Sequence, residues 1–300
     1  MKWRGRERSS NIEDRRGQSR GRTGGFSLPG GGARIPTGRA GGGGLGLLGV
    51  IVVLGIIWFA TGQNPLDMLT GGTSTGTTTN QQFSPPSANA GEDELAEFVS
   101  VVVKDTENLW TEVFAQNNLT YVPPRVVLFS QTTQTACGTA QSASGPFYCP
   151  TDKSVYIDLS FYDQLREQFR APGDFAQAYV VAHEIGHAVQ DQTGILPEFN
   201  RQRGSMSQEQ QNAYSVRVEL QADCYAGVWA NYVDQQNLLE AGDVEEAITA
   251  ANAIGDDTLT RGRVAERNFT HGTSAQRMAW LRRGMSTGDV SQCDTFNASI

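Results

Sequence analysis

Apolar residues recur at helical spacing in several stretches after residue 90. Residues 92–117 carry them every three or four positions, which predicts one long amphipathic helix. A second helix is predicted to run from Asp174, interpreted as its N-cap, to a stop at Gly194. Four further helices are predicted at residues 161–170, 207–236, 243–254 and from Thr273, the last three opened by capping-box patterns.

Two segments have the character of short strands. Residues 125–129 follow a Pro-Pro pair, and residues 154–159 follow a loop bracketed by two cysteines. Such strands beside long helices predict an α+β domain over residues 91–300, mostly helical with a small antiparallel sheet. The edge of a sheet of this kind can hold an extended peptide by backbone pairing.

The first ninety residues differ in composition from the rest of the chain. Residues 1–43 are rich in arginine and glycine and predict a basic, disordered tail. Residues 44–61 are uncharged and largely apolar, near the short end of the about 17–25 residues that cross a bilayer. Residues 62–90, rich in Gly, Thr, Ser and Pro, predict a flexible linker.

The apolar stretch predicts a single transmembrane helix in the cytoplasmic membrane. Every nearby Lys or Arg precedes it, so the positive-inside rule places the N-terminus in the cytoplasm and the C-terminal domain in the periplasm or another extracytoplasmic space. A cleaved signal peptide and a buried core helix are the alternatives. The long leader and the lack of a clear Ala-x-Ala site in the sequence disfavour cleavage.

Charge divides the chain in the same place. Residues 1–40 hold ten basic and three acidic side chains, while the remaining 260 residues hold 14 and 29. The net charge of −8 therefore combines a basic tail with an acidic body. Attraction of the tail to anionic lipid explains its charge with few assumptions, and nucleic-acid binding is not expected.

Residues 180–190 contain His-Glu-x-x-His within an apolar helical run. On a helix, His183 and His187 lie on one face and can bind a single ion. Glu184, one residue past the first histidine, can take a proton from the water that such an ion activates. The pattern predicts a zinc hydrolase, and the alternative is two helix histidines with ordinary hydrogen bonds.

Glu219 is the strongest candidate for the third ligand of one zinc ion. A catalytic zinc site takes three protein ligands, and Glu219 lies on a second predicted helix. Asp223, four residues further on, can accept the free ring N–H of a zinc-binding histidine. The alternative is a solvated acidic pair on a helix surface. Thr193 stands where a metzincin would have a third histidine, which excludes that class.

The remaining histidine, His271, precedes the last predicted helix. It can donate to the oxyanion formed when water adds to a carbonyl, make structural hydrogen bonds at the helix start, or bind the metal, in decreasing order of expectation. Asp256 and Asp257 lack the spacing of a calcium loop and are interpreted as a turn.

The four cysteines favour an oxidising compartment and allow three disulfide connectivities. The most economical pairing joins Cys137 to Cys149 across a short Gly/Ser-rich loop and Cys224 to Cys293 between a helix and the chain end. The sequence leaves the other two pairings open.

Several motifs occur in a fixed order along the chain: Met1-Lys-Trp-Arg-Gly-Arg, Asn11-Ile-Glu-Asp-Arg-Arg-Gly17, the apolar span, His183-Glu-Ile-Gly-His187, Glu219-Leu-Gln-Ala-Asp-Cys-Tyr-Ala-Gly227, Ile254-Gly-Asp-Asp257, Phe269-Thr-His-Gly-Thr and Cys293-Asp-Thr-Phe. This set resembles the bacterial YpfJ-type neutral zinc metallopeptidases over nearly the whole chain apart from the linkers. The resemblance implies membrane association and a gluzincin-like zinc peptidase domain. It implies no particular substrate.

The residues and the resemblance together predict a membrane-anchored zinc metallopeptidase acting on a peptide or protein. Zinc held by His183, His187 and Glu219 would polarise the scissile carbonyl, and Glu184 would act as general base. Two other functions stay open. One is a non-catalytic, membrane-tethered zinc-binding protein, which a closed four-ligand site would favour, and the other is a zinc amidase acting on cell-wall peptide.

Overall fold

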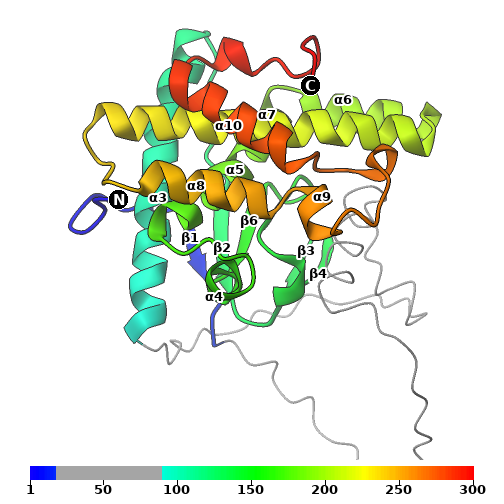
Figure 1. The fold of residues 1–300 in the computed structure, drawn as a ribbon. Helices are drawn as coiled ribbons and strands as arrows, with labels where there is room; N and C mark the ends of the chain where they lie inside the picture. Colours follow the sequence, from blue (N-terminus) through cyan, green and yellow to red (C-terminus); the bar gives the residue numbers. More distant parts are fainter. Residues whose placement is uncertain (18–89) are drawn as a thin grey trace, which may run out of the picture.

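The computed structural model describes residues 1–17 and 90–300 (Figure 1). The predicted membrane span at residues 44–61 and the linker before Ala90 lie outside these ranges. Among the helices of the described ranges, none has the length and hydropathy of a membrane span. The described residues form a mostly helical fold with two small sheets, in agreement with the predicted α+β class.

Five long helices form most of the domain: α3 (Ala90–Gln116), α5 (Asp174–Gln192), α7 (Gln208–Gln235), α8 (Asp243–Ala253) and α10 (Ser274–Thr287). In Figure 1, α3 stands upright while α7 and α8 lie across it, and α10 packs against both α7 and α8. The α7–α10 crossing depends on two glycines. A Cβ on Gly227 would lie 2.2 Å from the Leu281 carbonyl oxygen, and one on Gly284 would lie 2.0 Å from that of Cys224. Any larger residue would therefore push these helices apart.

Helix α5 is almost fully enclosed. Helices α3, α7 and α8 and the strands of the larger sheet pack around it, and nearly all its side chains from Phe175 to Asp191 are buried. This explains why the sequence shows a continuous apolar run there rather than a one-sided stripe. The polar side chains within the run lie inside the protein, where each needs a partner.

The remaining helical elements are short. They are α4 (Phe161–Glu167), α6 (Ile195–Gln202), α9 (Asp256–Leu259) and 3₁₀ turns at Ser142–Ser144, Arg203–Ser205, Glu266–Asn268 and Val290–Cys293. The predicted capping boxes at Ser207 and Thr273 are confirmed, and Gly194 follows α5 in a left-handed conformation as predicted.

Three predicted roles of aspartates at helix starts are wrong. Asp174 and Asp243 are the first helical residues of α5 and α8, after Gly173 and Gly242, and neither aspartate caps its helix. Their carboxylates bind the chain N-terminus instead. Asp256 opens the short helix α9 rather than a plain turn.

The larger sheet is mixed, which corrects the prediction of a small antiparallel sheet. Its order is β1-β2-β6-β5, from β1 (Ile12–Asp14), β2 (Arg125–Phe129), β5 (Phe147–Cys149) and β6 (Ser154–Asp158). Strands β1, β2 and β6 run parallel, and only β5 pairs antiparallel, with β6. Both β2 and β6 are almost fully buried, which is typical of parallel strands covered on both faces. A separate hairpin, β3 (Thr132–Thr135) and β4 (Gly138–Gln141), is antiparallel.

The N-terminal segment, residues 1–17, packs on the domain. The prediction of a disordered tail over residues 1–43 is therefore wrong for this part, while residues 18–43 lie outside the described ranges. Met1 and Trp3 are 3% and 5% exposed and belong to the main hydrophobic core. The physical reason is that the basic and polar residues of this segment have buried acidic partners, which composition alone does not reveal.

Both disulfides of the favoured pairing are present. Cys137 is bonded to Cys149, which ties the β3–β4 hairpin to β5. Cys224 in the middle of α7 is bonded to Cys293 near the chain end. The first disulfide lies next to the cleft described below, and the second holds the C-terminal residues against the helix that carries Glu219.

Candidate metal centre

The site is built where α5 and α7 cross. Gly186 of α5 faces Ala222 of α7 so closely that a Cβ on the glycine would lie 3.3 Å from the Ala222 Cα. Small residues at this crossing let the two helices approach. The approach brings His183 and His187 of α5 to Glu219 of α7, and all three side chains are buried.

The three predicted ligands form one cluster. His183 Nε2 lies 3.2 Å from Glu219 Oε2, and His187 Nε2 lies 3.6 Å from Glu219 Oε1. One ligand atom from each residue lies within 4.8 Å of the other two. Two imidazole nitrogens and one carboxylate oxygen are a donor set of catalytic zinc sites, so the residues present fit a zinc ion.

A hydrogen-bond partner at Nδ1 orients each histidine ring. His183 Nδ1 is 2.9 Å from Asp223 Oδ1, and His187 Nδ1 is 2.8 Å from Gln190 Oε1. The Gln190 amide is itself fixed, because its nitrogen donates to the Val218 carbonyl and to Gln221. Each ring therefore donates from Nδ1 and directs Nε2 towards Glu219, so loss of the Nε2 proton leaves the imidazole protonated at Nδ1. That is the tautomer that a metal ion needs.

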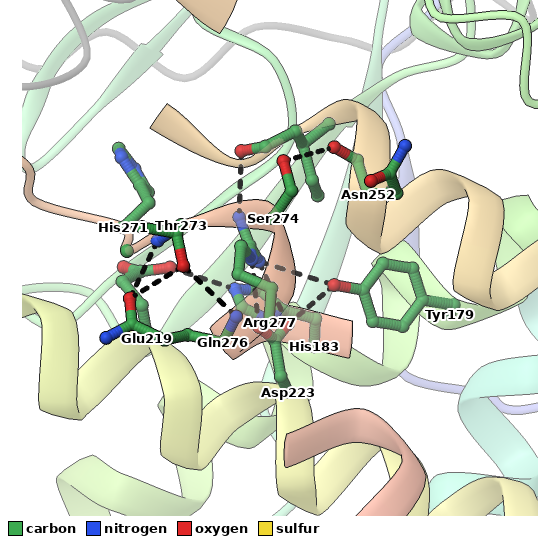
Figure 2. A network of polar contacts seen from close by, with 12 residues as sticks. Tyr179, His183, Glu219, Asp223, Asn252, His271, Thr273, Ser274, Gln276 and Arg277 are labelled. Atoms are coloured by element: carbon green, nitrogen blue, oxygen red, sulfur yellow. Dashed lines mark hydrogen bonds and ion pairs between the residues drawn. The ribbon is translucent and has the colours of Figure 1, made fainter. Parts of the chain in front are cut away.

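Asp223 is the centre of a larger polar network. Figure 2 shows Tyr179, His183 and Arg277 converging on its carboxylate, which is fully buried. Arg277 donates to both Asp223 oxygens at 2.8 and 2.9 Å, and the Tyr179 hydroxyl donates at 2.5 Å. The predicted placement of Asp223 behind a histidine ring is thus observed, with an arginine from α10 that balances its charge.

The electrostatics of the cluster favour a cation. Burial lowers the pKa of His183, but the carboxylates of Asp223 and Glu219 outweigh it and raise that pKa to about 10. Burial lowers the pKa of His187 to about 4. The pKa of Glu219 would rise on burial, yet the surrounding histidines hold it below its usual value. A proton therefore stays between His183 and Glu219 until a metal ion displaces it, so metal affinity should fall in acid.

Glu184 lies beside the ligands and outside their cluster. Its side chain is buried, and burial raises its pKa to about 7. A hydrogen bond from the Tyr148 backbone, on β5, acts in the opposite direction and lowers this pKa. A carboxyl group with a pKa near neutrality can accept a proton and later return it, as general acid–base catalysis requires.

His271 borders the same cavity but does not belong to the three-residue cluster of potential ligands. Its Nδ1 lies 3.2 Å from Asp256 Oδ1. The other oxygen of Asp256 accepts the backbone N–H groups of Thr270, His271 and Gly272 at 2.7, 2.7 and 3.2 Å. Asp256 thereby fixes the loop and the ring of His271 at the border of the cavity.

A cleft of about 420 Å³ opens over these residues. Apolar side chains from several elements line it beside the polar centre, among them Phe147, Phe161, Phe169, Leu196 and Phe199. Strand β5 supplies one wall, and the bonded Cys137 contributes to the rim. The cleft is large enough for several residues of an extended peptide with apolar side chains.

Sequence reasoning missed four supporting residues: Tyr148, Tyr179, Gln190 and Arg277. Gln190 stands three positions after His187, on the same helix face, and this spacing is the one signal that could have found it. Tyr179 likewise precedes His183 by one helical turn. Arg277 and Tyr148 come from distant parts of the chain, and no local spacing points to them.

Comparison with known proteins agrees with this geometry. The pattern of a family described as "Putative neutral zinc metallopeptidase" matches residues 1–296. The chain belongs to this family. It is 48% identical over 303 residues to "Uncharacterized protein YpfJ" of Escherichia coli (strain K12), with 100% of both chains covered. It is also 45% identical over 195 residues to "Uncharacterized protein Rv2575" of Mycobacterium tuberculosis (strain ATCC 25618 / H37Rv), covering 60% of this chain and 64% of that one. No solved structure gives a significant match.

Proposed function

We propose that the protein is a peptidase that uses one zinc ion held by His183, His187 and Glu219. The observation that carries the proposal is the convergence of these three ligand atoms within 4.8 Å, with Glu184 beside them in an open cleft. Three ligands leave a coordination position for the reaction, whereas a purely structural zinc site takes four. Membership of a zinc metallopeptidase family supports the same chemistry.

The surroundings of each residue in the site favour a particular role in peptide hydrolysis. When bound, zinc supplies a Lewis acid that polarises the scissile carbonyl and makes water nucleophilic at neutral pH. Glu184 takes the proton of the attacking water and returns it to the leaving amine. His271, oriented by Asp256, donates from Nε2 to the oxygen on which negative charge develops. Asp223 and Gln190 hold the two ligand rings in place.

An extended peptide is the substrate that the cleft fits best. Strand β5 ends the order of the larger sheet and borders the cleft, so its backbone can align a peptide strand over the metal ligands. The aromatic and aliphatic lining favours a substrate with apolar side chains next to the cleaved bond. Both disulfides support a location outside the cytoplasm.

The test compares the wild-type chain with Glu184→Gln in casein cleavage and in zinc content. We expect one zinc per chain in both proteins, and a loss of turnover of at least roughly 100-fold in the variant. Glu209→Gln is the matched control, because Glu209 is an exposed glutamate in the first turn of α7, and it should keep full activity.

Two outcomes would contradict the proposal. Full activity in Glu184→Gln would show that Glu184 is not the general base. Purified chains without zinc would show that the three residues do not form a zinc site. Zinc in both proteins with casein uncleaved by either would favour the non-catalytic zinc-binding protein, and release of peptide from cell-wall fragments instead would favour the amidase.

A further inference from the structure

The α-ammonium group of Met1 lies in a pocket of three carboxylates. Its nitrogen is 2.6 Å from Asp174 Oδ1, 3.2 Å from Asp243 Oδ1 and 3.3 Å from Glu240 Oε2. Burial lowers the pKa of this amino group, but Asp174 and Asp243 outweigh it and raise the pKa above its ordinary value of 8.0. The group is therefore a cation at neutral pH. We call these three residues and Met1 the amino-terminal pocket.

The carboxylates need this cation. Asp174, Asp243 and Glu246 bring oxygens within 4.8 Å of one another at the start of α5 and α8. Like charges at that separation destabilise a fold unless a positive group lies among them. Glu246 also accepts the Phe175 N–H at 3.1 Å, which keeps its carboxylate against α5. The Met1 ammonium supplies the positive charge from outside both helices.

The residues after Met1 satisfy further buried groups of the domain. Trp3 packs edge-on against Phe98 with ring centroids 5.6 Å apart. Arg6 forms two parallel bonds of 2.6 and 2.7 Å with Asp105, whose side chain is 3% exposed. Within the described ranges, Arg6 is the cationic side chain that pairs with this buried acid. Glu107 is buried as well and accepts hydrogen bonds from the N-terminal segment, from Ser9 at 2.5 Å and from Asn11 at 2.7 Å.

The segment then completes the sheet. The Val126 N–H donates to the Asn11 carbonyl at 2.8 Å, and the Arg15 N–H donates to the Leu128 carbonyl at 2.7 Å. Strand β1 thus covers the side of β2 that would otherwise present open backbone groups. The N-terminal segment, residues 1–17, therefore contacts the domain through its ammonium group, its apolar side chains, its ion pairs and its backbone hydrogen bonds.

We propose that the amino-terminal pocket is a recognition site for a free, unformylated peptide amino terminus, and that its occupant is Met1 of the same chain. A formyl or acetyl group would remove the positive charge and add atoms where Met1 is 3% exposed. A residue placed before Met1 would turn the ammonium into a neutral amide. Only a chain with an unmodified Met1 amino group docks its N-terminal segment fully. The family match includes this segment.

Docking also sets the side of the membrane on which the N-terminus lies. Residues 1–16 contact α3, α5 and α8 directly, so they share a compartment with the metal centre. A single transmembrane span at residues 44–61 would place the N-terminal segment and the domain on opposite sides of the membrane, so docking is incompatible with the single-pass topology that the sequence predicts. The inference does not depend on zinc or on peptidase activity, so it can fail or hold independently of the proposed function.

The first test uses the full chain with two N-termini, native and extended by Gly-Ser before Met1, each with and without Asp174→Asn. We expect intact mass to show an unformylated chain starting at Met1. In the native chain, Asp174→Asn should lower Tm by about 2–4 °C and speed hydrogen exchange at the Val126 and Arg15 amides. In the extended chain, Asp174→Asn should lower Tm by almost nothing further, because the ammonium group that pairs with Asp174 is already lost.

The control is Glu245→Gln, an exposed glutamate in the first turn of α8, which should behave as wild type in both chains. Equal effects of Asp174→Asn on the native and extended chains would overturn the proposal. So would a mass that shows a formylated Met1 or a different first residue.

The second test locates the N-terminus in intact cells. Ser10→Cys and Gln236→Cys place a thiol at exposed positions of the N-terminal segment and of the domain. A membrane-impermeant thiol reagent should label both or neither. Labelling of only one of the two would overturn the proposal.

Discussion

Two polar clusters include residues of the same helix, α5, yet they differ in how the chain encodes them. The candidate metal centre lies in the middle of α5 and joins residues 36 positions apart, His183 and Glu219. The amino-terminal pocket lies at the first residue of α5 and joins residues 173 and 242 positions apart. The first is fixed by helical spacing, which a sequence displays. The second is fixed by tertiary contact with the chain terminus, which no periodic pattern in the sequence indicates.

The largest expected effect removes a ligand from the metal centre. Glu219→Ala should abolish zinc binding and reduce peptidase turnover by at least about 1,000-fold, because two histidines alone hold zinc weakly. Zinc per chain and casein cleavage measure the two effects. Full zinc occupancy in this variant would show that another residue is the third ligand.

The next effect concerns the N-terminal segment. Arg6→Met should cost about 3–5 kcal/mol of unfolding free energy, measured by urea unfolding, because it leaves buried Asp105 without its cation. Arg6→Met combined with Asp105→Leu should recover much of this loss. Arg8→Met is the control, since the exposed Arg8–Glu97 pair should contribute less than about 1 kcal/mol. Equal losses for Arg6→Met and Arg8→Met would contradict the account of a docked segment.

A smaller effect is expected when the ring of His183 loses the carboxylate that orients it. In Asp223→Asn the ring loses its anionic acceptor, and zinc affinity should fall by about 10–100-fold in competition with a chelator. Asp234→Asn, an exposed aspartate on the same helix, is the control and should bind zinc normally. A lower Tm with unchanged zinc affinity would assign Asp223 a purely structural role.

The smallest effect is the pH dependence of the amino-terminal pocket. Folding raises the pKa of the Met1 amino group above 8.0, so its stabilisation is fully present below pH 8 and is lost as pH rises through the folded-state pKa. The groups facing it are Asp174 of α5, Asp243 and Glu246 of α8, and Glu240 before α8.

The stability difference between wild type and Asp174→Asn should therefore shrink from pH 7 to about pH 10. It should not exceed about 1 kcal/mol, because the Asp174 side chain is 35% exposed and solvent screens the pair. Chemical unfolding at several pH values measures it. A stability difference that does not change with pH would show that Asp174 does not act through the Met1 ammonium group.

The helices and the proposed ligands could be predicted because both follow from a period of about four residues. His183 and His187 share a face, and Glu219 and Asp223 share another. The capping boxes at Ser207 and Thr273 are equally local. The parallel pairing of β2 was missed although its apolar run, buried on almost every residue, is typical of parallel strands. Its partner β1 lies in a segment whose composition resembles a tail.

The N-terminal segment was misjudged for a physical reason. Arginines near a membrane span are usually solvated, and their number says nothing about buried acids elsewhere. Here Arg6 and Arg16 are largely buried and pair with acids of the domain. The predicted capping roles of Asp174 and Asp243 are wrong for the same reason, since the contact that engages them comes from the other end of the chain. Trp3, a large apolar residue between basic ones, was the available signal.

X-ray absorption at the zinc edge of the purified full chain tests the central claim most directly. The account predicts one zinc per chain with nitrogen and oxygen neighbours at about 2.0–2.2 Å, two of them imidazoles. In Glu219→Ala this signal should vanish together with the bound zinc. Sulfur neighbours at about 2.3 Å, or four protein ligands that close the site, would contradict it.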